Sequence, residues 1–205
     1  MRSATIKGLF LAMAIMVALP MSAAAQGTLG AGVSFLTGHG GTGFNVDYSA
    51  PIQTVGGDKT LSWVGAFSYH RNSDDDFGVD FSHSTMFIQG GVRVSGAINE
   101  NVTWFAQGLI GINRTSFDSE IGFDDDFCDI FDIDCDFEVE GSSTGVVFSP
   151  GGGIDYAFNE KTSFRAQINI PVGGGFGGFN GGGPAVYGGG NPQVILGVAI
   201  KTGAQ

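Results

Sequence analysis

The stretch Thr162-Ser-Phe-Arg-Ala-Gln-Ile-Asn-Ile170 decides the fold, because apolar and polar side chains alternate along it. Successive side chains of a β-strand point to opposite faces, so this stretch would present one apolar and one polar face. A membrane barrel strand has that form over about 9–11 residues, with its apolar face toward lipid and its polar face toward the lumen. We therefore expect residues 162–170 to form a membrane-spanning strand.

Seven other segments carry the same alternation. Helical spacing fits them poorly, and the glycines inside them would each weaken a helix by about 1 kcal/mol. Only helices and closed barrels satisfy their backbone groups in lipid. The pattern thus predicts an all-β protein, an eight-stranded antiparallel up-and-down transmembrane β-barrel. The eight segments are 28–37, 43–48, 60–70, 84–97, 102–113, 144–158, 162–170 and 193–202.

The links between these segments give an independent test of the barrel. Membrane barrels have short periplasmic turns and long outer loops, which must alternate along the chain. Here 99–101 and 159–161 are short and polar, as periplasmic turns should be, whereas 49–59 is longer than expected. The outer links are expected at 38–42, 71–83, 114–143 and 171–191, and only the first is short.

Residues 1–25 have the layout of a secretory signal peptide. Arg2 and Lys7 give a positive start, 8–19 are largely apolar, and 23–25 are alanines that would permit cleavage before Gln26. The alternative is a retained anchor, but the apolar run is short for a membrane-spanning helix. We therefore expect an exported chain with one barrel domain over residues 26–205.

The composition narrows the class of partner. The formal net charge is −11 at pH 7, and an acidic chain repels nucleic acid, so we expect no nucleic-acid partner. Outer-membrane lipid is the expected environment, and a monomer is favoured. The chain holds 36 glycines and only 14% charged residues, with no linker that would divide it into domains.

Polar positions on the inward face of the predicted strands carry charges of both signs. The lumen of an eight-stranded barrel is just wide enough to be filled by side chains, and buried charges must be paired. The pattern therefore predicts a satisfied internal network, and the functional alternative is a narrow gated pore. The expected interior polar residues are Asp47, Gln89, Arg93, Gln107, Asp155, Arg165, Gln167 and Asn169.

An acidic stretch between Thr115 and Gly141 holds eleven carboxylates and no basic residue. It also holds both cysteines, Cys128 and Cys135, for which export favours a local disulfide. The stretch is expected to be a solvated negative loop. The alternatives are a basic protein partner and a Ca²⁺ or Mg²⁺ site, since hard cations take several oxygen ligands. The candidate metal ligands are Asp124, Asp125, Asp126, Asp129, Asp132 and Asp134.

The chain resembles the small outer-membrane β-barrel proteins, the porin-like group of the OmpA transmembrane domain and OmpX. The residues that carry the resemblance are the exported start, the final strand and the block 151–170, in which a Gly-Ile-Asp-Tyr strand and a polar turn precede an Arg-containing return strand. The family usually ends in an aromatic residue, whereas this chain ends in Gln205. The resemblance implies a Gram-negative outer-membrane location and no cofactor, but no single activity.

No motif demands catalysis, and we expect no enzyme. Lipid-modifying barrels use a histidine with a serine near the outer surface, but the neighbours His83 and Ser84 would point to opposite faces of a strand. His39 and His70 are expected at outer strand ends or in loops, and the glycine-rich segment 173–190 is expected to be an outer loop. The sequence favours a structural or surface-interaction role through outer loops that contact a protein or other surface ligand. The alternatives are a small passive pore and a secreted lipocalin-like carrier.

Overall fold

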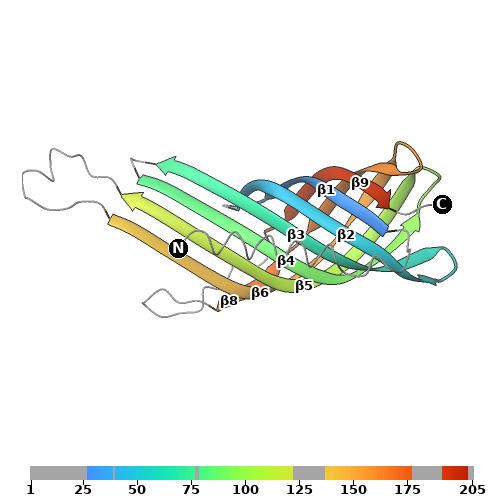
Figure 1. The fold of residues 1–205 in the computed structure, drawn as a ribbon, viewed down its shortest axis with the longest axis horizontal. Helices are drawn as coiled ribbons and strands as arrows, with labels where there is room; N and C mark the ends of the chain where they lie inside the picture. The colour runs from blue at the N-terminus through green and yellow to red at the C-terminus, as the bar shows by residue number, and fades with distance from the viewer. Residues whose placement is uncertain (1–26, 39, 77–78, 122–136, 177–190, 203–205) are drawn as a thin grey trace, which may run out of the picture.

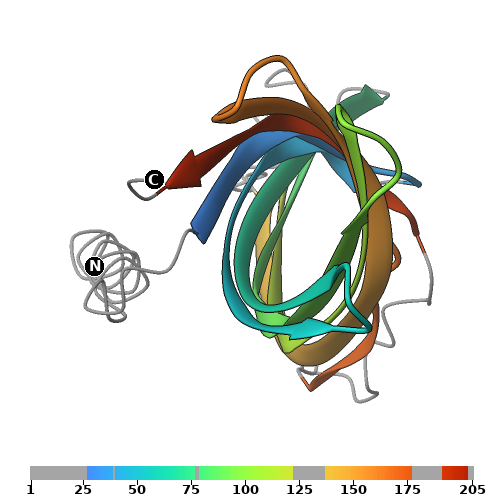
Figure 2. The same cartoon turned by 90° about the vertical axis from the view of Figure 1, so that its right-hand side faces the viewer.

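The computed structural model describes residues 27–38, 40–76, 79–121, 137–176 and 191–202, which form one antiparallel sheet closed into a barrel. Neighbouring strands pair in the order β5-β4-β3-β2-β1-β9-β7-β6-β8, and pairing of β5 with β6 closes the ring (Figure 2). The strands are β1 Gly27–Leu36, β2 Gly41–Val55, β3 Lys59–Asp76, β4 Val79–Ala97, β5 Val102–Ile121, β6 Phe137–Ala157, β7 Thr162–Asn169, β8 Val172–Phe176 and β9 Gln193–Thr202.

Strands β7 and β8 are two parts of one barrel strand. Both pair with β6 in the same register, because Gly151 faces Asn169 and Phe148 faces Val172. The break falls at Pro171, which has no backbone N–H to donate. Ile170 still bonds across the break, donating its N–H to the carbonyl of Pro150 at 2.8 Å. The described ring thus has eight strands, and the expected fold class is confirmed.

The outer face of the ring is apolar around its circumference. Large apolar side chains on the outward positions are about half exposed, as at Val33 (53%), Ile110 (61%) and Ile168 (51%). Most of the intervening positions of the same strands are buried or half-buried, and the alternation expected from the sequence runs through each of the eight segments. Soluble proteins rarely expose so continuous an apolar surface, so this belt is the part of the barrel that contacts lipid. In the described part of the chain, no helix is long and apolar enough to cross a membrane.

Several strands are longer than the sequence pattern indicated. The expected outer links 71–83 and 114–143 are in part strand, because β3 and β4 pair up to Asp76 and Val79, and β5 and β6 pair up to Ile121 and Phe137. These extensions need no apolar face, because backbone pairing can continue in water beyond the membrane. Figure 1 shows β3, β4, β5 and β6 reaching far past β1 and β9 at one end.

The opposite end of the barrel carries tight turns. The link expected at 49–59 is short in the structure, because Gly56 and Gly57 turn the chain with φ values of 64° and 85°, in the left-handed region that favours glycine. The other two turns are closed by asparagines. The Asn99 side-chain oxygen accepts from the N–H of Asn101 and of Val102, each at 2.9 Å, and Asn159 repeats the arrangement.

We predict that Val198→Arg, in the middle of β9 on the outer face, will destabilise the barrel in lipid vesicles. Val198 is 43% exposed, and an arginine facing the bilayer midplane costs about 2–4 kcal/mol. Urea unfolding of the protein in vesicles measures this loss. Ser142→Arg, at an exposed position on the outer extension of β6, is the control and should change little. Equal effects of the two variants would contradict a lipid-facing β9.

Candidate functional site

A cluster of buried charges lies inside the barrel, with Asp47 of β2 at its centre. One oxygen of Asp47, Oδ2, lies 3.0 Å from Nη2 of Arg93 on β4 and 2.8 Å from Nη1 of Arg165 on β7. The side chains of all three residues are at least 96% buried. One carboxylate therefore joins two arginines from opposite parts of the sequence, and each charge has a partner, as burial requires.

Asp155 of β6 completes this cluster. It holds Arg165 in a two-pronged contact, in which Nε and Nη2 of the arginine donate to Oδ1 and Oδ2, each at 2.8 Å. The ring of Phe105 lies beside both guanidinium groups, 4.4 Å from the Cζ atom of Arg93 and 5.0 Å from that of Arg165. Two arginines and two aspartates make the cluster neutral overall, so it places no net charge in the lumen.

Neutral side chains extend the cluster toward the end of the barrel that carries the long strand extensions. Arg93 donates from Nε (2.9 Å) and Nη2 (2.6 Å) to the side-chain oxygen of Gln107, whose amide donates to Asn169 at 2.9 Å. Asn169 in turn donates to the side-chain oxygen of Gln193 at 3.0 Å.

Gln193 of β9 carries the chain of hydrogen bonds to the remaining strands. Its amide donates to the hydroxyls of Ser34 and Ser68, each at 3.0 Å. The Ser34 hydroxyl also lies 2.8 Å from Nε2 of His70, and the Asn45 amide donates to Ser68 at 2.8 Å. The connected set, which we call the lumen network, takes a side chain from each of the eight barrel strands. Its members are Ser34, Asn45, Asp47, Ser68, His70, Arg93, Gln107, Asp155, Arg165, Gln167, Asn169 and Gln193.

Glycines on the inward face make room for these long side chains. A Cβ atom on Gly30 would overlap the carboxylate of Asp47 and the guanidinium of Arg165, and one on Gly153 would overlap the ring of Phe105. The inward positions of β1 and β6 are thus small where β2, β4 and β7 contribute large groups, so the polar residues fit a narrow lumen.

Apolar side chains fill further parts of the lumen. Leu36, Phe87 and Val147 form one buried apolar cluster, and Val64, Ala66 and Leu109 form another. Gln89 donates to Ser149 at 2.6 Å beside them. A lipocalin-like carrier would need an open apolar interior and a polar exterior, which is the reverse of the arrangement here.

The structure places all eight polar residues named from the sequence inside the barrel. Seven belong to the lumen network, and Gln89 bonds to Ser149. Sequence reasoning did not include Ser34, Asn45, Ser68, Phe105 and Gln193 among the site residues. His70 was expected at a strand end or in a loop, but it faces the lumen and is fully buried. His70 lies an even number of residues from Ser62, Ala66 and Ser68 along β3, so the alternation of the strand places it on the same inward face.

Other expected sites lie outside the described residues. These are the signal peptide, His39, both cysteines, and the six candidate metal ligands between 124 and 134. Within the ranges that the structure describes, no group of three or more His, Cys, Asp or Glu is placed to hold a metal ion. His83 is described, and its ring Nε2 lies 3.1 Å from the hydroxyl of Thr85.

Comparison with solved structures agrees with this architecture. The barrel is similar to Ail, the attachment invasion locus protein of Yersinia pestis, with a TM-score of 0.54 and 14% identity over 87% of this chain and 99% of that one. For Ail in complex with the heparin analogue sucrose octasulfate, the TM-score is 0.51 and the sequence identity is 16%, over 87% of this chain and 97% of that one. For Neisserial surface protein A the TM-score is 0.47 and the sequence identity is 14%, over 86% of this chain and 95% of that one. No protein-family model and no curated protein sequence matches the chain.

At these identities the likeness to Ail shows the fold. The chain has the fold of the small outer-membrane β-barrel proteins, as its resemblance to the OmpA and OmpX group indicated. The apolar belt on the outside of the ring agrees with an outer-membrane location.

We predict that Asp47→Asn will lower the free energy of unfolding by about 3–5 kcal/mol, because it leaves two buried arginines short of a carboxylate. Asp155→Asn is the matched control. Among the described residues, the Asp155 carboxylate forms an ion pair with Arg165 alone, and its side chain is 17% exposed, so its loss should cost less. Urea unfolding in vesicles measures the free energy of unfolding of both variants, with the shift in gel mobility on heating as the readout of folded protein. An Asp47 variant as stable as the wild type would contradict the role of this carboxylate.

Proposed function

We propose that this chain is an integral protein of the Gram-negative outer membrane that acts as a non-catalytic surface-binding protein, with a closed barrel as its anchor. The observation that carries the proposal is the contrast between the two parts of the described structure. The lumen is filled by paired side chains, whereas the strands at one end continue well past the lipid-facing belt.

The filled lumen supports an anchor rather than a pore. The lumen network crosses the barrel between Asp155 on β6 and Ser68 on β3, and its central salt bridges are only 2.8–3.0 Å long. An ion would have to displace buried charges that are already paired, at a cost of several kcal/mol. The barrel would therefore hold the protein in the membrane without conducting.

The strand extensions support a binding surface outside the membrane. Strands β3 and β4 pair beyond His70, up to Asp76, and β5 and β6 pair beyond Asn113, up to Ile121. Continuous pairing makes these extensions a single sheet, which can present a ligand surface with little loss of conformational entropy on binding. The end that carries them would be the outer end, because the opposite end has only tight turns.

The charge of the chain favours a basic ligand. Ail was crystallised with a polyanion, the heparin analogue sucrose octasulfate. This chain has a net charge of −11, and its stretch 115–141 has eleven carboxylates and no basic residue. Repulsion between like charges disfavours a sulfated ligand here and favours a basic protein segment.

Three further features belong to the same proposal. Residues 1–25 would direct export and be removed, which leaves a barrel domain over 26–205. A disulfide between Cys128 and Cys135 would tie the acidic stretch locally. Its aspartates 124–126, 129, 132 and 134 would also be able to hold Ca²⁺ or Mg²⁺, since both ions prefer oxygen ligands.

We predict that the full-length mature protein in nanodiscs will bind a fluorescent lysine-rich peptide and will not bind sucrose octasulfate. Fluorescence anisotropy measures both. Changing the six aspartates between 124 and 134 to asparagine should weaken peptide binding at least about tenfold, whereas Cys128→Ser with Cys135→Ser keeps the charge and serves as the control. Adding Ca²⁺ tests whether cations compete with the peptide. Binding of the sulfated ligand in preference to the peptide would contradict the assignment.

We also predict that the wild-type protein will be silent in planar lipid bilayers. A lumen filled by this network would leave no continuous water path, so single-channel recordings at 100 mV should show no discrete current steps. Protein that migrates as the folded form on a gel before insertion is the required control. Regular steps from folded wild-type protein would favour the passive pore over the surface-binding protein.

A further inference from the structure

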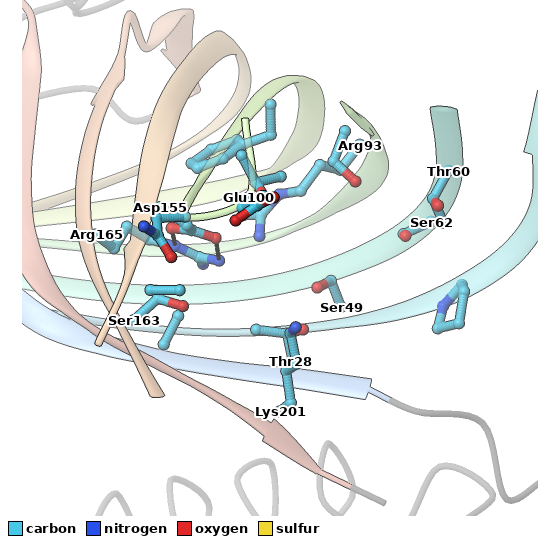
Figure 3. Close-up of a pocket in the computed structure, with 17 residues that line it drawn as sticks. Thr28, Ser49, Thr60, Ser62, Arg93, Glu100, Asp155, Ser163, Arg165 and Lys201 are labelled. Carbon is cyan, nitrogen blue, oxygen red and sulfur yellow. Dashed lines mark hydrogen bonds and ion pairs between the residues drawn. The ribbon is translucent and has the colours of Figure 1, made fainter. Parts of the chain in front are cut away.

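A cavity of about 350 Å³ opens between the ion cluster and the tight turns at the periplasmic end of the barrel. We call it the vestibule, and Figure 3 shows its walls. Seven hydroxyl side chains from six barrel strands line it, which are Thr28, Ser49, Thr60, Ser62, Ser95, Thr103 and Ser163. Its volume lies within the range of about 300–1,000 Å³ that is typical of small-molecule sites.

The hydroxyls of the vestibule are free, unlike those of the lumen network. Ser34, Ser68 and Ser149 each bond to a glutamine side chain in the middle of the barrel. None of the seven vestibule hydroxyls has a side-chain hydrogen bond to another described residue. They are therefore donors and acceptors available to a molecule inside the vestibule.

The wall of the vestibule toward the ion cluster is formed by Arg93, Arg165 and Asp155. Arg93 lines the cavity and is 97% buried, and its Nε and Nη2 atoms have partners. Its Nη1 atom is buried without any hydrogen-bond partner. Figure 3 shows Arg93 reaching into the cavity near Arg165 and Asp155, with Ser49 and Thr28 across from them. Because Nη1 has almost no accessible surface, this wall presents a paired ion cluster, and the hydroxyls around it supply the free hydrogen-bonding groups.

The charges around the vestibule balance. Arg93, Arg165 and Lys201 are opposed by Asp47 behind the wall and by Asp155 and Glu100 on it. Three positive and three negative groups give no net charge, so the vestibule does not select an anion or a cation by charge alone. Free hydroxyls beside paired ions fit a neutral ligand rich in hydroxyl groups.

We propose that the vestibule binds a small, uncharged, polyhydroxylated molecule of the sugar or polyol class, which enters from the periplasmic side. Several hydroxyls of such a ligand would bond to the ring of serines and threonines. This site is formed by the barrel alone and does not involve the acidic stretch 115–141. The experiments on the vestibule and on the proposed surface role therefore test the two proposals independently.

Titration of the isotope-labelled full-length mature protein in nanodiscs with glucose, followed by NMR, tests the proposal. Glucose should cause saturable shifts at vestibule residues such as Ser62 and Ser95. Gluconate and glucosamine are similar to glucose in size, but gluconate is negatively charged and glucosamine positively charged. Each should bind more weakly than glucose because the site is neutral. Ser62→Ala, Ser95→Ala and Thr103→Val combined should weaken glucose binding at least about tenfold, because three hydrogen-bonding groups are lost.

Thr144→Val is the matched control, since Thr144 is exposed on the outer part of β6. It should leave the glucose titration unchanged. Absence of saturable shifts in folded wild-type protein would overturn the proposal, as would a triple variant that folds and still binds glucose like the wild type. Tighter binding of gluconate or glucosamine would also overturn it, because the site would then select a charge.

Discussion

The structure depends on one constraint, which is that no backbone N–H or C=O can be left unpaired in lipid. The sheet meets it by pairing its first strand with its last, with Gly27 opposite Thr202 and Leu36 opposite Gln193. A ring of eight strands encloses only a narrow space, and side chains must fill it. The alternation along each strand follows from this arrangement. Every second side chain faces lipid and must be apolar, and the others face the lumen and must pack within it.

The interior then decides what the barrel can do. Because Asp47 bridges Arg93 and Arg165, the inward charges hold β2, β4 and β7 together and form one neutral cluster inside the lumen. Polar contacts continue outward to Ser34 and His70, while the hydroxyls on the other side of the cluster are left free. One closed ring thus holds a packed middle, a hydroxyl-lined cavity at the end with the tight turns, and a sheet that extends past the ring at the other end.

Much of the fold is predictable from sequence, because a period of two follows directly from strand geometry. It places Arg165, Gln167 and Asn169 on the inner face without any tertiary information. The pairs they form are not predictable in this way, since Asp47 and Arg165 are 118 residues apart and meet only through the register of the closed ring. The ends of the strands were also missed. Residues 72–76 and 114–121 pair in water, where no apolar alternation marks them.

The central claim is that β7 presents alternate residues to lipid and to a packed lumen. Single spin labels at successive positions from Ser163 to Ile168, in the full-length mature protein in a bilayer, test it most directly. Collision with oxygen, which is concentrated in the lipid, should be frequent at Phe164, Ala166 and Ile168 and rare at Ser163 and Gln167. The opposite phase, or the same accessibility at every position, would contradict the account.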